Sequence, residues 1–166
     1  MGGNMSSKIP VAISFSGIAN LLGVLGVIGS LLFVGLELQQ SQRIAQAQQQ
    51  QERIAAFLNL IGSNNAAGVD WQSTVYEADS EASEQLSQAE IVRRNNYHAH
   101  LFNYENDYFQ YTQSLMTDAV WDAKLQALSF FYNQCDMRVL IDFRMRWFPS
   151  GFNEIIKTLP NSCSDD

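Results

Sequence analysis

The chain has 166 residues, a mass of 18.7 kDa and a formal net charge of −7, with 17 acidic and 10 basic side chains. This length fits one modest domain. An acidic balance argues against nucleic acid as a partner, because neutralising phosphates requires a basic surface. The charge is also unevenly spread, since every acidic residue lies at Glu37 or beyond.

The uncharged stretch of residues 11–36 predicts a membrane-spanning helix. Its sequence, VAISFSGIANLLGVLGVIGSLLFVGL, contains one amide, Asn20, and no ionisable group. As a helix it measures about 39 Å, more than the roughly 30 Å hydrocarbon core of a bilayer. We therefore expect a single-pass protein in a lipid bilayer, with residues 1–10 as an N-terminal tail. The alternative is a signal peptide cleaved near Ala45-Gln46-Ala47, but the apolar run is about twice the usual length of a signal-peptide core.

Small side chains recur through this stretch at spacings of four and three, which places them along one seam of a slightly supercoiled helix. They are Ala12, Ser16, Ala19, Gly23, Gly26 and Ser30. Helices associate in lipid through close backbone approach and interhelical hydrogen bonds, and Asn20 beside the seam supplies an amide for such a bond. We predict an oligomer interface made by these seven residues. The neighbouring helix is either another copy or a different membrane protein.

The charges that flank the span favour a cytoplasmic C-terminal domain by a small margin. Lys8 precedes the span, whereas Arg43 and Arg53 follow it within about twenty residues, the window in which the positive-inside rule counts.

The glutamine-rich residues 37–62 predict a helical stalk. Glutamine is a good helix former, and no glycine or proline separates this stretch from the span before Gly62. A narrow apolar stripe runs along it: Ile44, Ala47, Ile54, Leu58 and Ile61. We expect one helix from Pro10 to about Ile61, ended by Gly62 to Asn65. The polar part is either a self-association zone or a linker.

Residues 63–166 predict a small helical domain. A capping box at Ser87 to Glu90 opens a long aromatic-rich helix to about Ser114, and further helices are expected to start near Asp118, Asp136 and Ser150. No strand alternation of useful length occurs. The predicted fold is therefore all-α: a single-pass transmembrane helix that continues into a long stalk helix, followed by a small helical bundle.

Three segments of the chain, FVGLELQQSQ, FNYENDYFQYTQSLMTDAVW and WFPSGFNEII, carry a resemblance. Their pattern resembles a widespread family of uncharacterised bacterial proteins with one N-terminal membrane helix and a small helical domain. The shared residues are Phe102, Glu105, Tyr108, Gln110, Leu115, Asp118, Trp121, Trp147, Phe148 and Phe152. The resemblance implies a bacterial inner-membrane protein and brings no activity with it. The family often has an arginine directly after the span, where this chain has residues 37–40 instead.

The strongest candidate for chemistry is a helix that carries both histidines of the chain with two carboxylates. His98 and Glu105 stand seven residues apart on one face, and His100 and Asp107 on another. Imidazole and carboxylate suit zinc or iron, but two pairs on neighbouring faces do not form one site. We therefore assign no metal, cofactor or catalytic residue, and expect Glu105 to be a polar residue of the domain core.

Arg144 is the expected partner of Glu105, with Asp142 as the alternative, in a half-buried ion pair. No phosphate-binding glycine loop, nucleophile elbow or zinc-protease motif occurs in the chain. Cys135 and Cys163 are too few and too far apart for a zinc motif. They either pair in an oxidising compartment or remain thiols in a reducing cytoplasm.

These features predict a non-enzymatic membrane-anchored scaffold that self-associates through its transmembrane seam into a homo-oligomer or array. The alternative is an accessory subunit that docks on another membrane protein and recruits a partner. A metal-dependent enzyme that uses the histidine and carboxylate helix is the weakest hypothesis.

Overall fold

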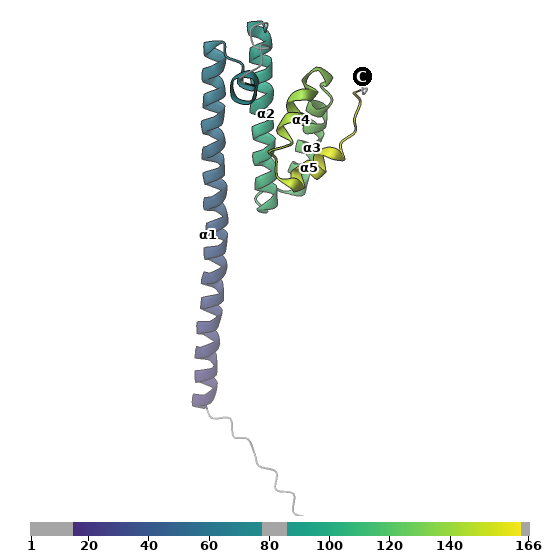
Figure 1. Cartoon of the computed structure of the whole chain (residues 1–166). Coiled ribbons are helices and arrows are strands. Elements are labelled where there is room, and N and C mark those ends of the chain that lie inside the picture. The colour runs from purple at the N-terminus through teal and green to yellow at the C-terminus, as the bar shows by residue number, and fades with distance from the viewer. Residues whose placement is uncertain (1–14, 78–85, 164–166) are drawn as a thin grey trace, which may run out of the picture. The chain divides into compact units, whose positions relative to one another are not determined.

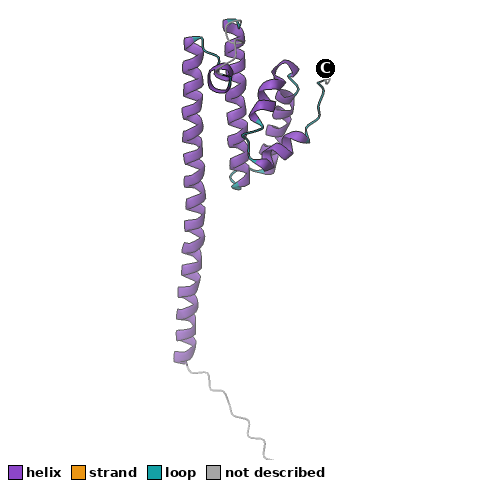
Figure 2. Cartoon of the chain, viewed as in Figure 1, coloured by secondary structure: helices purple, strands orange, loops and turns teal. Residues whose placement is uncertain are grey.

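The structure of the protein is a computed structural model that describes residues 15–77 and 86–163. Every regular element in these two ranges is helical, and neither range contains a strand (Figure 2). The elements are α1 (Phe15–Ala67), the π-helical turn η1 (Gln72–Tyr76), α2 (Gln88–Thr112), α3 (Asp118–Tyr132), the 3-10 turn η3 (Cys135–Met137), α4 (Arg138–Arg144) and α5 (Ser150–Lys157). Figure 1 shows them in chain order. The predicted all-α fold is confirmed. The predicted tail and the first residues of the span, Ala12 included, lie outside the described residues.

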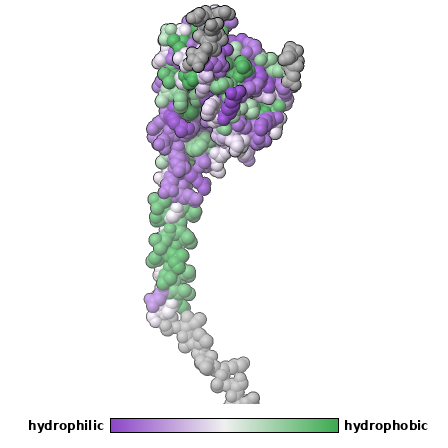
Figure 3. All heavy atoms as spheres, viewed as in Figure 1, coloured by the Kyte–Doolittle hydropathy of each residue, from purple (hydrophilic) through white to green (hydrophobic). Residues whose placement is uncertain are grey.

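The chain divides into two compact units, residues 1–42 and residues 43–166, and α1 contributes to both. The described part of the first unit, residues 15–42, consists of α1 alone. Its side chains are all exposed, and its apolar stretch is the green part of α1 in Figure 3. By length and composition, α1 is the one described helix able to cross a membrane, and it lies near the N-terminus.

The second unit, which we call the head, includes the last part of α1. Ala47, Ile54 and Ile61 are buried, and their spacing of seven residues places them on one face of the helix. Gln110 of α2 donates a hydrogen bond to the Ala47 carbonyl at 3.3 Å. The predicted stalk, residues 37–62, is therefore divided. From Arg43 onward the glutamine-rich helix belongs to the head, where Ala47, Ile54 and Ile61 of its apolar stripe are buried, Leu58 is partly buried and Ile44 stays exposed.

Helix α1 ends at Ala67, six residues later than the predicted end at Ile61. Gly62 continues the helix, because one glycine costs only about 1 kcal/mol in a helix interior. The helix ends instead at Gly68, whose φ of +70° suits glycine. Gln88 of α2 also donates to the Asn65 carbonyl at 3.1 Å. This contact with α2 stabilises the extra turn, and it is invisible in the local sequence.

Two apolar cores hold the head together. The larger core is formed by side chains from every helix from α2 to α5. Its buried residues are Tyr97, Leu101, Tyr104, Trp121, Leu128, Met137, Leu140, Ile141, Phe148, Phe152 and Ile156. The smaller joins α1, α2 and the segment around η1, and consists of Ile54, Ile61, Trp71 and Phe102. Aromatic rings supply much of both, as a small domain requires. The predicted capping box of α2 is confirmed, since the Ser87 N–H donates to Glu90 at 2.7 Å.

Candidate functional site

The predicted seam residues that the structure describes, Ser16, Ala19, Gly23, Gly26 and Ser30, lie on an exposed helix surface. At Gly23 and Gly26 no atom lies within 4 Å of the position that a Cβ would take. The Ser30 hydroxyl donates to the Gly26 carbonyl at 2.9 Å, so its donor is used within the helix, while its oxygen can still accept a hydrogen bond. The backbone along this seam is therefore free to approach a neighbouring helix closely.

Asn20 is the polar exception on this surface. Its side chain is exposed, and the part of the chain that the structure describes provides no hydrogen-bond partner for its amide. Placing an amide in hydrocarbon without a hydrogen-bond partner costs on the order of several kcal/mol of free energy. A lipid-embedded Asn20 therefore requires a partner from outside this helix.

The two predicted polar residues of the core lie together in the head. Arg144 Nη2 lies 3.2 Å from Glu105 Oε2, and Arg144 Nη1 donates to the Tyr76 hydroxyl at 2.8 Å. The guanidinium also lies over the Phe102 ring, 4.2 Å from its centroid. Burial raises the pKa of Glu105, although the Arg144 charge acts against that rise. Arg144 pairs with Glu105 and not with the alternative, Asp142.

A second ion pair joins the segment before η1 to α2. Arg94 donates to both oxygens of Asp70, at 2.9 and 3.2 Å, and the Ser73 hydroxyl donates to Asp70 at 2.7 Å. Burial alone would raise the pKa of Asp70, but the hydrogen bonds from Arg94 and Ser73 outweigh it and lower the pKa. No local pattern predicts this pair, which forms only when the segment before η1 packs against α2.

The histidine and carboxylate helix does not assemble a metal site. His98 is fully buried, whereas the His100 ring packs on Phe131 with centroids 4.5 Å apart. Asp107 binds Lys124 at 3.0 Å. The described residues contain no group of three or more histidine, cysteine or acidic side chains able to hold a metal ion.

The His98 imidazole is buried without a hydrogen bond to any described residue. Neither ring nitrogen has a hydrogen-bond partner among the described residues. Burial, together with the Arg144 charge, lowers the pKa of His98 to about 3. The imidazole is therefore neutral at physiological pH, and its protonation opposes folding.

A groove lined by α1, α2 and the segment after α4 lies beside the Glu105–Arg144 pair. Three adjoining cavities of about 260, 570 and 290 Å³ share Arg53 as a lining residue. Glu105 lines the first two, and Trp147 borders the first with 65% of its surface exposed. Arginine and tryptophan are enriched among the residues that dominate protein interfaces. The sequence analysis gave Arg53 no role in such a groove, because it faces Glu105 only after α1 packs on α2.

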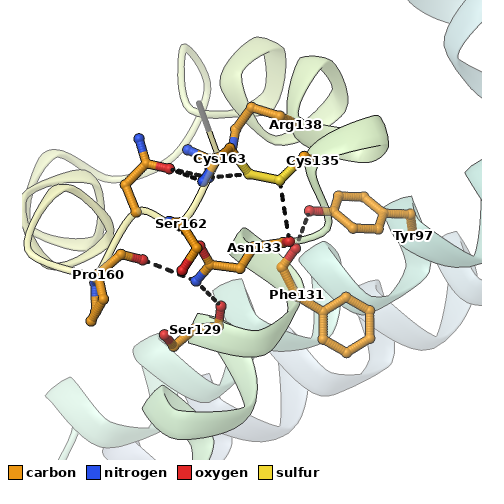
Figure 4. The surroundings of a disulfide bond; sticks show 10 residues. Tyr97, Ser129, Phe131, Asn133, Cys135, Arg138, Pro160, Ser162 and Cys163 are labelled. Carbon is orange, nitrogen blue, oxygen red and sulfur yellow. Dashed lines mark hydrogen bonds between the residues drawn. A yellow bond between two sulfur atoms is a disulfide. The ribbon is translucent and has the colours of Figure 1, made fainter. Parts of the chain in front are cut away.

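The two cysteines form a disulfide bond between η3 and the C-terminal tail. Asn133 holds the same tail through its amide, which donates to the Pro160 carbonyl at 2.9 Å and accepts from the Ser162 N–H at 2.6 Å (Figure 4). Of the two alternatives left open by the sequence, the structure has the paired one.

Arg138 completes this attachment of the tail. Its Nη2 donates to Cys163 Sγ at 3.3 Å and to Asn161 Oδ1 at 2.9 Å, and its guanidinium lies 3.6 Å from the centroid of the Tyr132 ring. The disulfide is therefore one part of a clamp that also contains hydrogen bonds and a cation–π contact. Spacing alone does not predict this clamp, since α3 and α4 must first bring its parts together.

The fold and these sites define a class: an all-helical protein with one helix able to span a membrane and a disulfide-linked helical head. No protein-family model, curated protein or solved structure matches this chain. The resemblance to a family of bacterial membrane-anchored proteins therefore stays a prediction.

Proposed function

We propose that the protein is a non-enzymatic scaffold, anchored in the bacterial inner membrane, that self-associates through the seam of its transmembrane helix. The observation that carries this proposal is Asn20, an amide without a described partner in the uncharged stretch of α1. It lies beside small residues that leave the backbone open. A second copy of the same helix supplies both a close-packing surface and a hydrogen-bonding amide.

Retention of the span as an anchor is supported by the position of the alternative cleavage site. Residues Ala45 to Ala47 lie within α1, and the Ala47 carbonyl accepts a hydrogen bond from buried Gln110. Once the head has folded, cleavage there would require local unfolding of a packed helix. The packing of this site in α1 supports retention of the span as an anchor.

The test is the oligomeric state of the full chain in mild detergent, measured by light scattering after gel filtration. Wild-type protein is expected as a discrete homo-oligomer. The Gly23→Leu, Gly26→Leu double variant is expected to lose that state, because bulk blocks close approach without reducing hydrophobicity. Neither substitution meets an atom within its own chain, so insertion and the fold of the head stay intact.

Gly35→Leu is the matched control for this experiment. In the heptad register Gly35 lies on the face opposite the seam, and it also has no atom within 4 Å of a Cβ. This variant should keep the wild-type oligomer. A monomeric wild type, or an oligomer unchanged by the double variant, would contradict the proposal.

The groove of the head favours a second candidate function, that of an accessory subunit that recruits another protein. Its exposed tryptophan beside Arg53 has the composition of an interface hot spot. Under this alternative, a second polypeptide copurifies in fixed proportion with the wild type and is lost from Trp147→Ala. Phe130→Ala is the control, since Phe130 is 70% exposed and does not line the groove.

A further inference from the structure

We infer that the head lies on the oxidising, non-cytoplasmic side of the membrane; this inference rests on the proposed anchoring of the span. The observation behind it is a disulfide bond. Cys135 and Cys163 are the only cysteines of the chain, and they are joined to each other. Disulfides persist in the periplasm and outside the cell, whereas thiol reductants of the cytosol keep such pairs open.

Because the disulfide is exposed, the compartment in which the head lies determines whether the disulfide stays oxidised. Cys135 is exposed, and Cys163 is only partly buried. Burial therefore does not shield the sulfur atoms from glutathione or thioredoxin. A surface disulfide of this kind depends on its surroundings for its oxidised state.

The clamp explains why these two sulfur atoms meet. Asn133 and Arg138 bind residues 160–163 through side-chain hydrogen bonds that do not require the disulfide. The tail is thus held next to η3 before oxidation, which raises the effective concentration of one thiol near the other. These hydrogen bonds favour the pairing of the two thiols in an oxidising compartment.

The charges around the span oppose this orientation by one charge only, which does not decide it. The positive-inside count favours the cytoplasm by one charge, from Arg43 and Arg53 against Lys8. That rule governs loops of up to about 60 residues, and longer domains cross the membrane largely regardless of charge. Residues 37–166 exceed that length, while Lys8 lies beside the apolar run on the side that would stay in the cytoplasm.

This orientation limits the partners that the groove can meet. The recess around Arg53 and Trp147 then faces the cell envelope, so a partner of the second candidate function would come from the envelope and not from the cytosol. The span then acts as an uncleaved signal anchor, with the N-terminal tail inside the cell.

The first experiment measures the redox state of the full chain in growing bacterial cells. Thiols are trapped by acid precipitation and treated with a polyethylene-glycol maleimide, with or without prior reduction. We expect no gel shift in the unreduced sample and a shift of two adducts after reduction. In a host that lacks its periplasmic thiol oxidase, the two adducts should appear without reduction. Free thiols in ordinary cells would overturn the inference.

The second experiment locates the head directly and does not depend on the disulfide. In a Cys135→Ser, Cys163→Ser background, single reporters are introduced as Asp122→Cys on exposed α3 and Ser6→Cys before the apolar run. A membrane-impermeant maleimide should label the Asp122→Cys protein in intact spheroplasts, and the Ser6→Cys protein only after lysis. The reverse pattern would overturn the inference.

Failure of the inference differs from failure of the proposed function. An oligomer that stays in the membrane during carbonate washing but has free thiols would support the proposed scaffold and contradict the inferred orientation. A monomer with an intact disulfide keeps the orientation and rejects self-association. A protein that is oxidised but is released from the membrane by carbonate washing would support export of the head and contradict the proposed anchor.

Discussion

The hydroxyl of Tyr108 occupies the space that a side chain on residue 151 would need. A Cβ on Gly151 would clash with the Tyr108 hydroxyl oxygen. The Tyr108 ring stacks on Phe152 with centroids 5.1 Å apart, so it cannot turn aside without disturbing the core. The close approach of α5 to α2 therefore depends on glycine at position 151.

We expect Gly151→Ala to destabilise the head by about 1–3 kcal/mol, the usual cost of forcing a methyl group into a packed site. Urea unfolding followed by circular dichroism measures this loss. Tyr108→Phe removes the clashing oxygen, so the Gly151→Ala, Tyr108→Phe double variant should recover most of the stability. A loss of the same size in both variants would show that the clash is not the cause.

Gly62→Ala is the control for this comparison. The substitution is the same, but Gly62 is an exposed helical residue with no atom within 4 Å of a Cβ. Alanine there should stabilise the protein by up to about 1 kcal/mol, since it favours the helix.

Reduction of the disulfide should lower the free energy of unfolding by about 3–4 kcal/mol. The Cys135–Cys163 bond closes a loop with a sequence separation of 28, and the figure follows from the entropy of closing such a loop in the unfolded chain. Urea unfolding with and without reductant gives the difference. The Cys135→Ser, Cys163→Ser variant should show reduced stability that reductant does not change. Equal stability of the reduced and oxidised wild type would contradict this expectation.

The elements that the sequence predicts well are those that carry a local signal. The capping box at Ser87 and the stop at Pro149 place the starts of α2 and α5, because both act through neighbouring backbone groups. The end of α1 was predicted too early, since its last turn is stabilised by Gln88, which lies 23 residues from the Asn65 carbonyl that it binds. Local propensity does not contain that contact.

The predicted site residues also divide into those with a local sequence signal and those that depend on tertiary contacts. The small-residue seam is a pattern along one helix and is readable from its spacing. Arg144 and Glu105 were proposed as partners from their chemistry, with Asp142 equally open, and only the packing of α4 on α2 separates the two options. The role of Arg53 in the groove depends on tertiary contacts, and no local pattern predicts it.

Glu105→Ala should destabilise the head by about 2–4 kcal/mol. The Arg144 side chain is 6% exposed, so removing the carboxylate leaves a buried charge with one hydrogen-bond partner fewer. The partial exposure of Glu105, at 21%, keeps the expected loss below that of a fully buried pair. Thermal or urea unfolding of the variant measures it.

Asp107→Ala is the matched control two residues along the same helix. Asp107 also forms an ion pair, but its partner Lys124 is 44% exposed, and such surface pairs contribute about 0–1 kcal/mol. Equal losses for the two variants would mean that burial of Arg144 does not set the cost.

His98 makes the head sensitive to mild acid. Burial and the Arg144 charge lower the pKa of His98 to about 3, whereas an unfolded histidine titrates near 6.5. Below about pH 6.5 the unfolded chain therefore binds a proton that the folded head does not. Stability is full above that pH and falls as the pH drops, by up to about 1.4 kcal/mol per pH unit.

The carboxylates with shifted pKa values do not produce this fall in stability between pH 7.5 and 5. The lowered pKa of Asp70 matters only below its ordinary value of 3.8, while burial raises the pKa of Glu105 and so partly offsets the loss in acid. Urea midpoints measured across this range should fall for the wild type and stay nearly flat for His98→Leu. His100→Asn should retain most of the fall, because His100 is exposed and its pKa is lowered by partial burial alone. A wild-type slope that survives in His98→Leu would assign the proton uptake to another group.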